Sequence, residues 1–142
     1  MRDIDKAKLI LVDGGYTCVL CKGDLVYTST ERGVRPVLGW LSDGVDMKGF
    51  SVADKIVGKA AALLFVLAGI TEIYAPIMSR GAVSVFSLNG IKYEASTITD
   101  YIVNRQGNGQ CPMEMTVDSI SDPRIAYVAL MKKSEELRKL AK

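Results

Sequence analysis

The chain has 142 residues, 49% of them hydrophobic and 24% charged, and its 18 Lys and Arg against 16 Asp and Glu give a formal net charge of +2. These values are typical of one globular domain, which we expect to span residues 1–142. The balanced charge, with no basic stripe interleaved with aromatic residues, argues against a nucleic-acid polymer as partner. The sequence contains no His, which excludes Ser-His-Asp and Cys-His nucleophiles and histidine-ligated zinc sites.

No run of residues has the length and hydropathy of a targeting or membrane-spanning segment. The longest apolar run near the N-terminus covers residues 9–12, whereas a signal peptide carries roughly 7–15 apolar residues there. The most apolar run of the chain, residues 60–70, is well short of the about 20 residues that a membrane span needs. We therefore expect a cytoplasmic protein with no membrane association.

Three cysteines, Cys18, Cys21 and Cys111, make an odd count that fits a reducing compartment. Cys18 and Cys21 have the CxxC spacing, but they lie in a strand-like run. Residues three apart on a strand point to opposite faces. We therefore interpret both as ordinary strand cysteines, and we expect no bound metal and no cofactor.

Helical and strand-like patterns alternate along the chain, which predicts an α/β domain. The expected elements are a helix over 3–13 that ends at Gly14-Gly15, a hairpin of strands over 16–21 and 25–29, helices over 34–41 and 52–68, a strand over 72–78, a helix over 80–88, a strand over 91–95, one or two helical turns over 99–104, a helix that starts near 111–114, and a last helix from 123 to 140. The start of the 52–68 helix rests on the capping-box spacing of Ser51-Val52-Ala53-Asp54. We expect these elements to form a three-layer α/β/α sandwich with a mixed sheet.

Lys59 is the first candidate for chemistry, because it lies in a helix pattern that is apolar nearly all round. Lys55 is one turn earlier on the same side, and Gly58 leaves room for a group to approach the backbone. Lys59 would bind an anion or act as a base with a lowered pKa. The alternative is a lysine with a buried stem and a structural glutamate partner.

Ser79-Arg80-Gly81 forms a second candidate at a strand-to-helix junction. Free N–H groups at a helix start, together with an arginine, make a ready anion site. Open α/β sheets bind ligands at such junctions. The alternative is a capped helix with a solvated arginine.

Cys111 and Glu114 form a third candidate at the start of a helix, after the glycine-rich loop 106–110. A cysteine at a helix start can have a lowered pKa, and the loop could close over a ligand. Without His, its base would be Lys59, Glu114 or Asp54. The alternatives are a cysteine that merely caps the helix and an Asp54 that merely caps another.

Two strings, residues 53–64 (ADKIVGKAAALL) and Cys111-Pro112-Met113-Glu114, resemble a bacterial and archaeal family known as a domain of unknown function, with a cytidine-deaminase-like fold. The resemblance covers nearly the whole chain, and it implies that fold. Many proteins of this fold self-associate, so the resemblance also implies a homo-oligomer.

Zinc deaminases carry His or Cys, then x-Glu, at one helix start and Pro-Cys-x-x-Cys at the next. In this alignment Val57 replaces the metal ligand and Lys59 the proton-shuttling glutamate. Ile77 and Arg80 replace the two cysteines. The zinc ligands are absent, but Lys59 and Arg80 would keep the cleft cationic.

Three functions remain open from the sequence. The first is binding of a small anion, such as a nucleotide or phosphosugar, by Asp54, Lys55, Gly58, Lys59, Ser79, Arg80 and Cys111. The second is a metal-independent enzyme that uses Cys111 as nucleophile or Lys59 as base or Schiff-base amine, with Glu114 as a further catalytic candidate. The third is a structural or protein-interaction domain with a vestigial site.

Overall fold

A computed structural model describes residues 1–103 and 109–140. In chain order its elements are α1 (Asp3–Gly14), β1 (Cys18–Lys22), β2 (Leu25–Ser29), α2 (Arg35–Ser42), β3 (Ser51–Asp54), β4 (Ile56–Val57), α3 (Lys59–Ala68), β5 (Glu72–Ser79), α4 (Arg80–Leu88), β6 (Lys92–Thr99), α5 (Pro112–Thr116) and α6 (Pro123–Leu140). The six strands form one mixed sheet. β1 is antiparallel to β2 and β3, whereas β5 is parallel to β3, β4 and β6.

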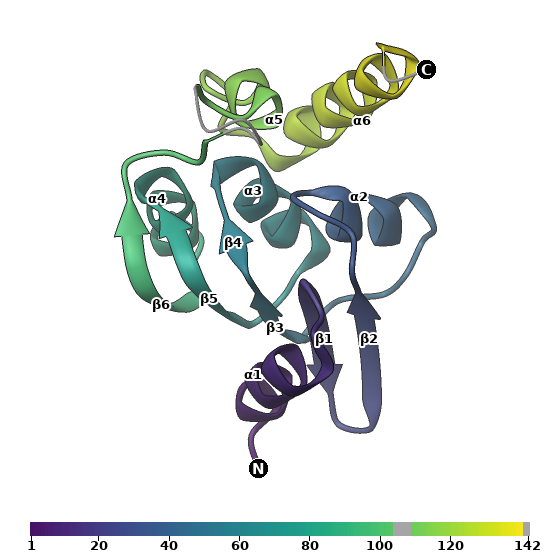
Figure 1. Cartoon of the computed structure of the whole chain (residues 1–142), viewed down its shortest axis with the longest axis vertical. Helices are drawn as coiled ribbons and strands as arrows, with labels where there is room; N and C mark the ends of the chain where they lie inside the picture. The colour runs from purple at the N-terminus through teal and green to yellow at the C-terminus, as the bar shows by residue number, and fades with distance from the viewer. Residues whose placement is uncertain (104–108, 141–142) are drawn as a thin grey trace.

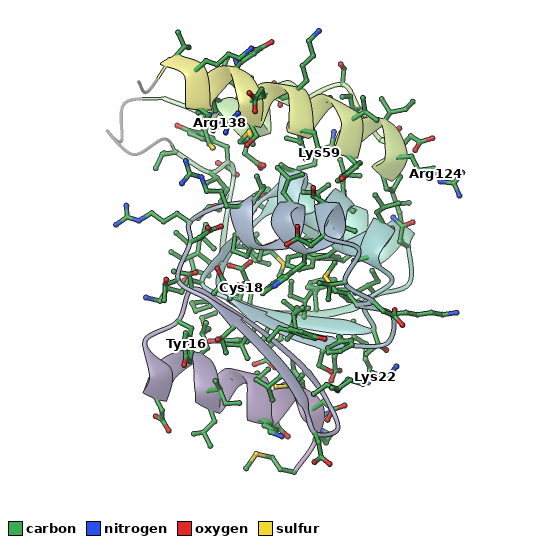
Figure 2. All side chains as sticks on the ribbon, turned by 90° about the vertical axis from the view of Figure 1, so that its right-hand side faces the viewer. Tyr16, Cys18, Lys22, Lys59, Arg124 and Arg138 are labelled. Carbon is green, nitrogen blue, oxygen red and sulfur yellow. The ribbon has the colours of Figure 1, made fainter. Side chains whose placement is uncertain are left out.

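The molecule is layered along its long axis (Figure 1). α1 covers one face of the sheet, where Ala7 and Leu11 pack against Val19 and Ala53. α2, α3 and α4 cover the other face, and α6 lies across α3 on the side away from the sheet (Figure 2). The α/β class and the mixed sheet are confirmed, and α5 with α6 adds a layer to the expected three.

Among the described residues, no helix is both long and apolar enough to cross a membrane.

The additional layer follows from the composition of α3. Its residues 60–65 (AAALLF) are all buried, so an apolar surface remains on the side that does not face the sheet. α6 covers that surface with Ala126 and Leu130, both fully buried. A helix that is apolar nearly all round needs partners on both sides.

Several predicted elements are confirmed with small shifts at their ends. α1 ends at Gly14, and its C-cap Gly15 has a φ of 68°, which lies in the left-handed region. β1 and β2 pair as a hairpin through Gly23-Asp24. Cys18 and Cys21 lie in clusters on opposite faces of the sheet, as the strand period predicts. The helices predicted at 34–41, 80–88 and 123–140, the helix predicted to start near 111–114 and the strand at 72–78 are also present.

The predicted start of the 52–68 helix is wrong. Ser51–Asp54 is strand β3, Ile56–Val57 is strand β4, and the helix begins only at Lys59. All four residues of β3 are buried because α1 covers one face and α3 the other. A strand buried on both faces loses the alternation that separates it from a helix, and Asp54 is therefore not a capping residue.

The helical turns predicted over 99–104 are also wrong for the described residues 99–103. β6 continues to Thr99, because it pairs with β5 over its whole length, from Glu72 opposite Lys92 to Ser79 opposite Thr99. Residues 104–108, which include most of the glycine-rich loop 106–110, lie outside the described residues.

Ser79→Ala is predicted to lower the free energy of unfolding by about 1 kcal/mol, because the Ser79 hydroxyl accepts a 3.1 Å hydrogen bond from the Ala82 N–H as the N-cap of α4. Urea denaturation of both proteins measures the difference. Ser84→Ala, an exposed change within α4, is the control and should leave stability equal or slightly higher. Equal losses in the two variants would contradict the capping role.

Candidate functional site

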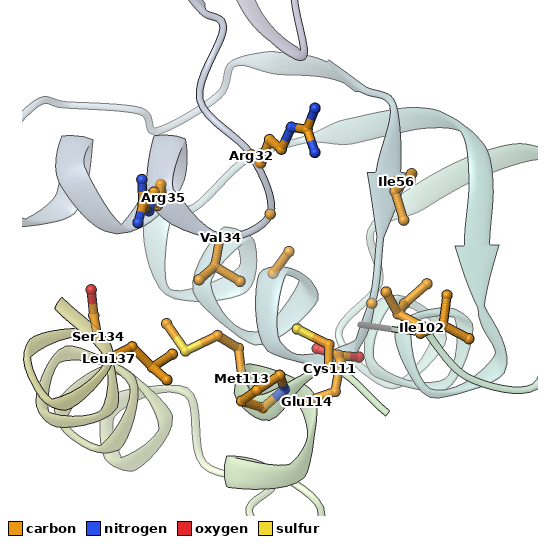
Figure 3. Close-up of a pocket in the computed structure, with 15 residues that line it drawn as sticks. Arg32, Val34, Arg35, Ile56, Ile102, Cys111, Met113, Glu114, Ser134 and Leu137 are labelled. Carbon is orange, nitrogen blue, oxygen red and sulfur yellow. The ribbon is translucent and has the colours of Figure 1, made fainter. Parts of the chain in front are cut away.

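A cavity of about 580 Å³ lies between the sheet-and-helix core and the C-terminal helices (Figure 3). We call residues 1–103 the core and residues 111–140 the C-terminal cap. The core supplies Arg32, Gly33, Val34, Arg35, Ile56, Gly58, Ala61, Ile102 and Val103, and the cap supplies Cys111, Pro112, Met113, Glu114, Ser134 and Leu137. The volume is in the range of small-molecule sites.

The lining is mainly apolar and has two cations on one side. Arg32 and Arg35 are exposed and lie with Val34 across the cavity from Met113 and Cys111 (Figure 3). Among the described residues, neither arginine forms an ion pair. Neither arginine is among the site residues predicted from the sequence, although both lie next to the start of α2, which has a proline in its first turn.

Glu114 joins the cap to the core. Its Oε1 accepts a 2.7 Å hydrogen bond from the Lys59 N–H, and its Oε2 accepts a 2.8 Å bond from the Ala60 N–H. These two groups are in the first turn of α3, where N–H groups have no partner within the helix. Burial raises the pKa of Glu114, and the hydrogen bonds from Ala60 and Lys59 oppose that shift.

Gly58 is required where Glu114 approaches α3. Its φ of −103° is open to any residue, so backbone conformation does not explain the glycine. A Cβ at this position would overlap the Glu114 carboxylate and lie 2.8 Å from Ile102 Cγ1. A close approach to the backbone was predicted at Gly58, and the group that approaches is the Glu114 side chain of the same chain.

Lys59 is held to the cap by its side chain as well. Its Nζ donates a 3.0 Å hydrogen bond to the carbonyl oxygen of Asp118. Lys59 does not line the cavity. Lys59 was also considered as a lysine with a structural glutamate partner. Its side chain instead bonds to a backbone carbonyl, and Glu114 accepts a hydrogen bond from its backbone N–H.

Ser79 and Arg80 are close to Lys59 in the fold but outside the cavity. A Cβ on Gly81 would lie 3.2 Å from Lys59 Cβ, so the starts of α3 and α4 are adjacent. The Arg80 Nε donates to Asp100 Oδ1 at 2.8 Å in an exposed ion pair. The predicted junction is present, and an exposed carboxylate of the chain already pairs with its arginine.

Asp54 is buried at the end of β3, next to Cys18, and does not line the cavity. Burial raises the pKa of Asp54 to about 7, while hydrogen bonds from the Ile56 N–H, the Cys18 thiol and the Lys55 N–H oppose the shift. Burial, together with the Asp54 carboxylate, raises the pKa of the Cys18 thiol well above its usual value. Lys55 is exposed and is also outside the cavity.

Of the predicted site residues, the structure brings Gly58, Cys111 and Glu114 to the cavity. Cys111 is half-buried, whereas Cys18 and Cys21 are fully buried. Within residues 1–103 and 109–140, no group of three Cys, Asp or Glu side chains is arranged to hold a metal ion.

Residues 6–133 match the family model described as TM1506, domain of unknown function (DUF1893). The chain belongs to the DUF1893 family. Its structure is similar to the crystal structure of a DUF1893 family protein (TM1506) from Thermotoga maritima, with a TM-score of 0.85, and the match covers 94% of this chain and 91% of that one. At 22% sequence identity, the likeness shows a shared fold. A comparison with curated proteins finds no match.

The buried carboxyl of Asp54 is predicted to make the protein less stable as the pH rises from about 4 to about 7. The unfolded chain has an Asp pKa of about 3.9, whereas the folded value is about 7, so between these values the unfolded state binds fewer protons. The loss is on the order of 4 kcal/mol, and it is complete above pH 7.

Asp54→Asn removes the titrating group and should flatten most of this slope, leaving the smaller contribution of Glu114, which has the same sign. Urea denaturation at pH 4.5, 6 and 8 measures it. A wild-type slope equal to that of Asp54→Asn would contradict the burial of an ionisable Asp54.

Cys111 is predicted to be the one cysteine of the native protein that iodoacetamide modifies at a measurable rate. Cys18 and Cys21 are fully buried, and Cys111 is at the cavity wall. Peptide mapping after native alkylation locates the label, and Cys111→Ser is the control. Labelling of Cys18 at a similar rate would contradict the described packing of β1.

Proposed function

We propose that this protein binds a small organic anion with an apolar body in the cavity between the core and the C-terminal cap. The observation that carries the proposal is an apolar cavity of about 580 Å³ with two arginines, Arg32 and Arg35, on one side. Apolar walls with a few polar groups are the usual composition of a ligand site. The arginines supply the fork geometry that suits carboxylates and phosphates.

The lining favours one part of the predicted ligand class over the other. A phosphosugar would bring several hydroxyls against Val34, Ile102 and Leu137, where they would lose hydrogen bonds to water without replacement. A nucleotide base or an acyl chain would lose less. We therefore favour a nucleotide-like or acyl-type anion over a phosphosugar.

The position of the anion site differs from the one predicted. Lys59 and Arg80 already have partners in Asp118 and Asp100, and Glu114 takes the first N–H groups of α3. These contacts support Arg32 and Arg35 as the ligand's cations.

A more specific fold than the α/β class is also proposed. We infer a cytidine-deaminase-like arrangement in which Val57-Gly58-Lys59 and Ile77 to Arg80 replace the two zinc motifs. Its support is that β4 pairs with β5 and that Gly81 adjoins Lys59, so both strand-to-helix junctions lie side by side.

A second candidate is a metal-independent enzyme with Cys111 as nucleophile. The supporting observation is that Cys111 and Glu114 line the same cavity. Lys59 is a weaker candidate, since it is outside the cavity and bonded to Asp118. Turnover of a bound ligand that Cys111→Ser abolishes would favour this candidate.

Thermal denaturation with AMP, CMP, octanoate, ribose 5-phosphate and inorganic phosphate tests the binding proposal. A ligand at 100 times its Kd adds about 2.7 kcal/mol of stability, which raises the Tm of a chain of this length by roughly 5–11 °C. We expect such a shift with a nucleotide or octanoate. We expect no shift with inorganic phosphate.

The matched variants are Arg32→Gln with Arg35→Gln, which should abolish the shift, and Arg80→Gln, which should retain it. Arg80 is an exposed arginine outside the cavity, so its loss controls for the removal of a surface positive charge away from the site. A shift that survives loss of both cavity arginines, or no shift with any probe, would contradict the proposal.

A further inference from the structure

The C-terminal cap buries a smaller share of its residues than the core does. Five of its 30 residues are buried: Met113, Glu114, Val117, Ala126 and Leu130. The four apolar ones belong to the same buried cluster as α3. On the outer side of α6, Ile125 and Val128 are 58% and 67% exposed. Segments with little buried apolar surface open at lower free energy than the core of a protein.

Polar contacts at one place supplement this apolar contact. Glu114 accepts hydrogen bonds from Lys59 and Ala60, and Lys59 Nζ donates to the Asp118 carbonyl. All three bonds connect the first turn of α3 to residues 114–118. Glu114 is the one buried charged residue described in the cap, and Gly58 leaves the space that it fills.

We propose that the C-terminal cap undocks from the core as a unit, and that the Glu114 contact with the first turn of α3 sets its docking equilibrium. The sheet and its cover by α1, α2 and α4 lie within the core, so the core would remain folded, while undocking would expose the face of α3 that Ala126 and Leu130 cover. The cavity would be lost on undocking, because core and cap each supply part of its wall.

This geometry makes ligand binding and docking mutually stabilising, a consequence that rests on the proposed function. A molecule in the cavity touches Val34 on the core and Met113 on the cap. It binds the docked state alone, so occupancy raises the docked population and docking raises affinity by the same factor.

Hydrogen exchange of the full chain, read by mass spectrometry without any ligand, tests the undocking. In the wild type, peptides of α5 and α6 should exchange at least tenfold faster than those of β1 and β3. Glu114→Gln keeps the side-chain shape but removes the charge and one acceptor, and should speed exchange in α5, α6 and the first turn of α3 at least another tenfold. Glu136→Gln, an exposed change on α6, is the control and should change none of these peptides.

Gly58→Ala supplies a second variant that acts on the same contact from the core side. Its Cβ displaces the Glu114 carboxylate, so its exchange pattern should match that of Glu114→Gln. In a Glu114→Ala background the same Gly58→Ala change should have a smaller effect, because the overlapping carboxylate is gone. The contact with Ile102 remains in both backgrounds and cancels in the comparison.

Exchange of α6 at the rate of β1 and β3 in the wild type would overturn the proposal, as would equal acceleration of all peptides by Glu114→Gln. A second arm adds octanoate or AMP. Slower exchange in the cap alone would support the coupling. If neither compound has an effect while the ligand-free results hold, the proposed function fails for these probes and the undocking stands.

Discussion

The carboxylate of Glu114 at the first turn of α3 is the buried polar contact that joins the core to the cap, the two parts that form the wall of the cavity. A helix start offers N–H groups that the helix cannot satisfy, together with the positive end of its dipole. Here a side chain 55 positions away in sequence accepts from two of them, Lys59 and Ala60. The start of α3 is thereby capped from outside, and the same bonds hold α5 in place.

This contact changes which cations are available to a ligand. The sequence placed anion recognition at Lys59 and Arg80, but the chain supplies partners to both, at Asp118 and Asp100. The proposed function therefore places anion recognition at Arg32 and Arg35, on the other side of the cavity from α5. A helix start that resembles an anion site in the sequence can be occupied by an anion of the same chain.

Local signals predicted much of the fold, and long-range contacts explain the failures. The Gly14-Gly15 stop, the hairpin of strands predicted over 16–21 and 25–29 and the Ser79 cap are local, and each lies within two residues of its predicted position. β3 was missed because burial on both faces removes its alternation, and the end of β6 was missed because pairing with β5 extends it.

The site was predictable only in part, because its geometry depends on contacts between residues that are far apart in sequence. Gly58, Cys111 and Glu114 were selected, but nothing local shows that Glu114 reaches Gly58 across 56 residues. Arg32 and Arg35 were missed because they line a cavity only when the cap, which is distant in sequence, lies across from them.

The backbone amide resonances of Lys59 and Ala60, followed by NMR as a function of pH, test the central contact most directly. Both amide protons are predicted to titrate together, with an apparent pKa above that of a free glutamate, since burial raises the pKa of Glu114. In Glu114→Gln this titration should disappear. Amide shifts that do not titrate in the wild type, or that titrate unchanged in Glu114→Gln, would contradict the contact.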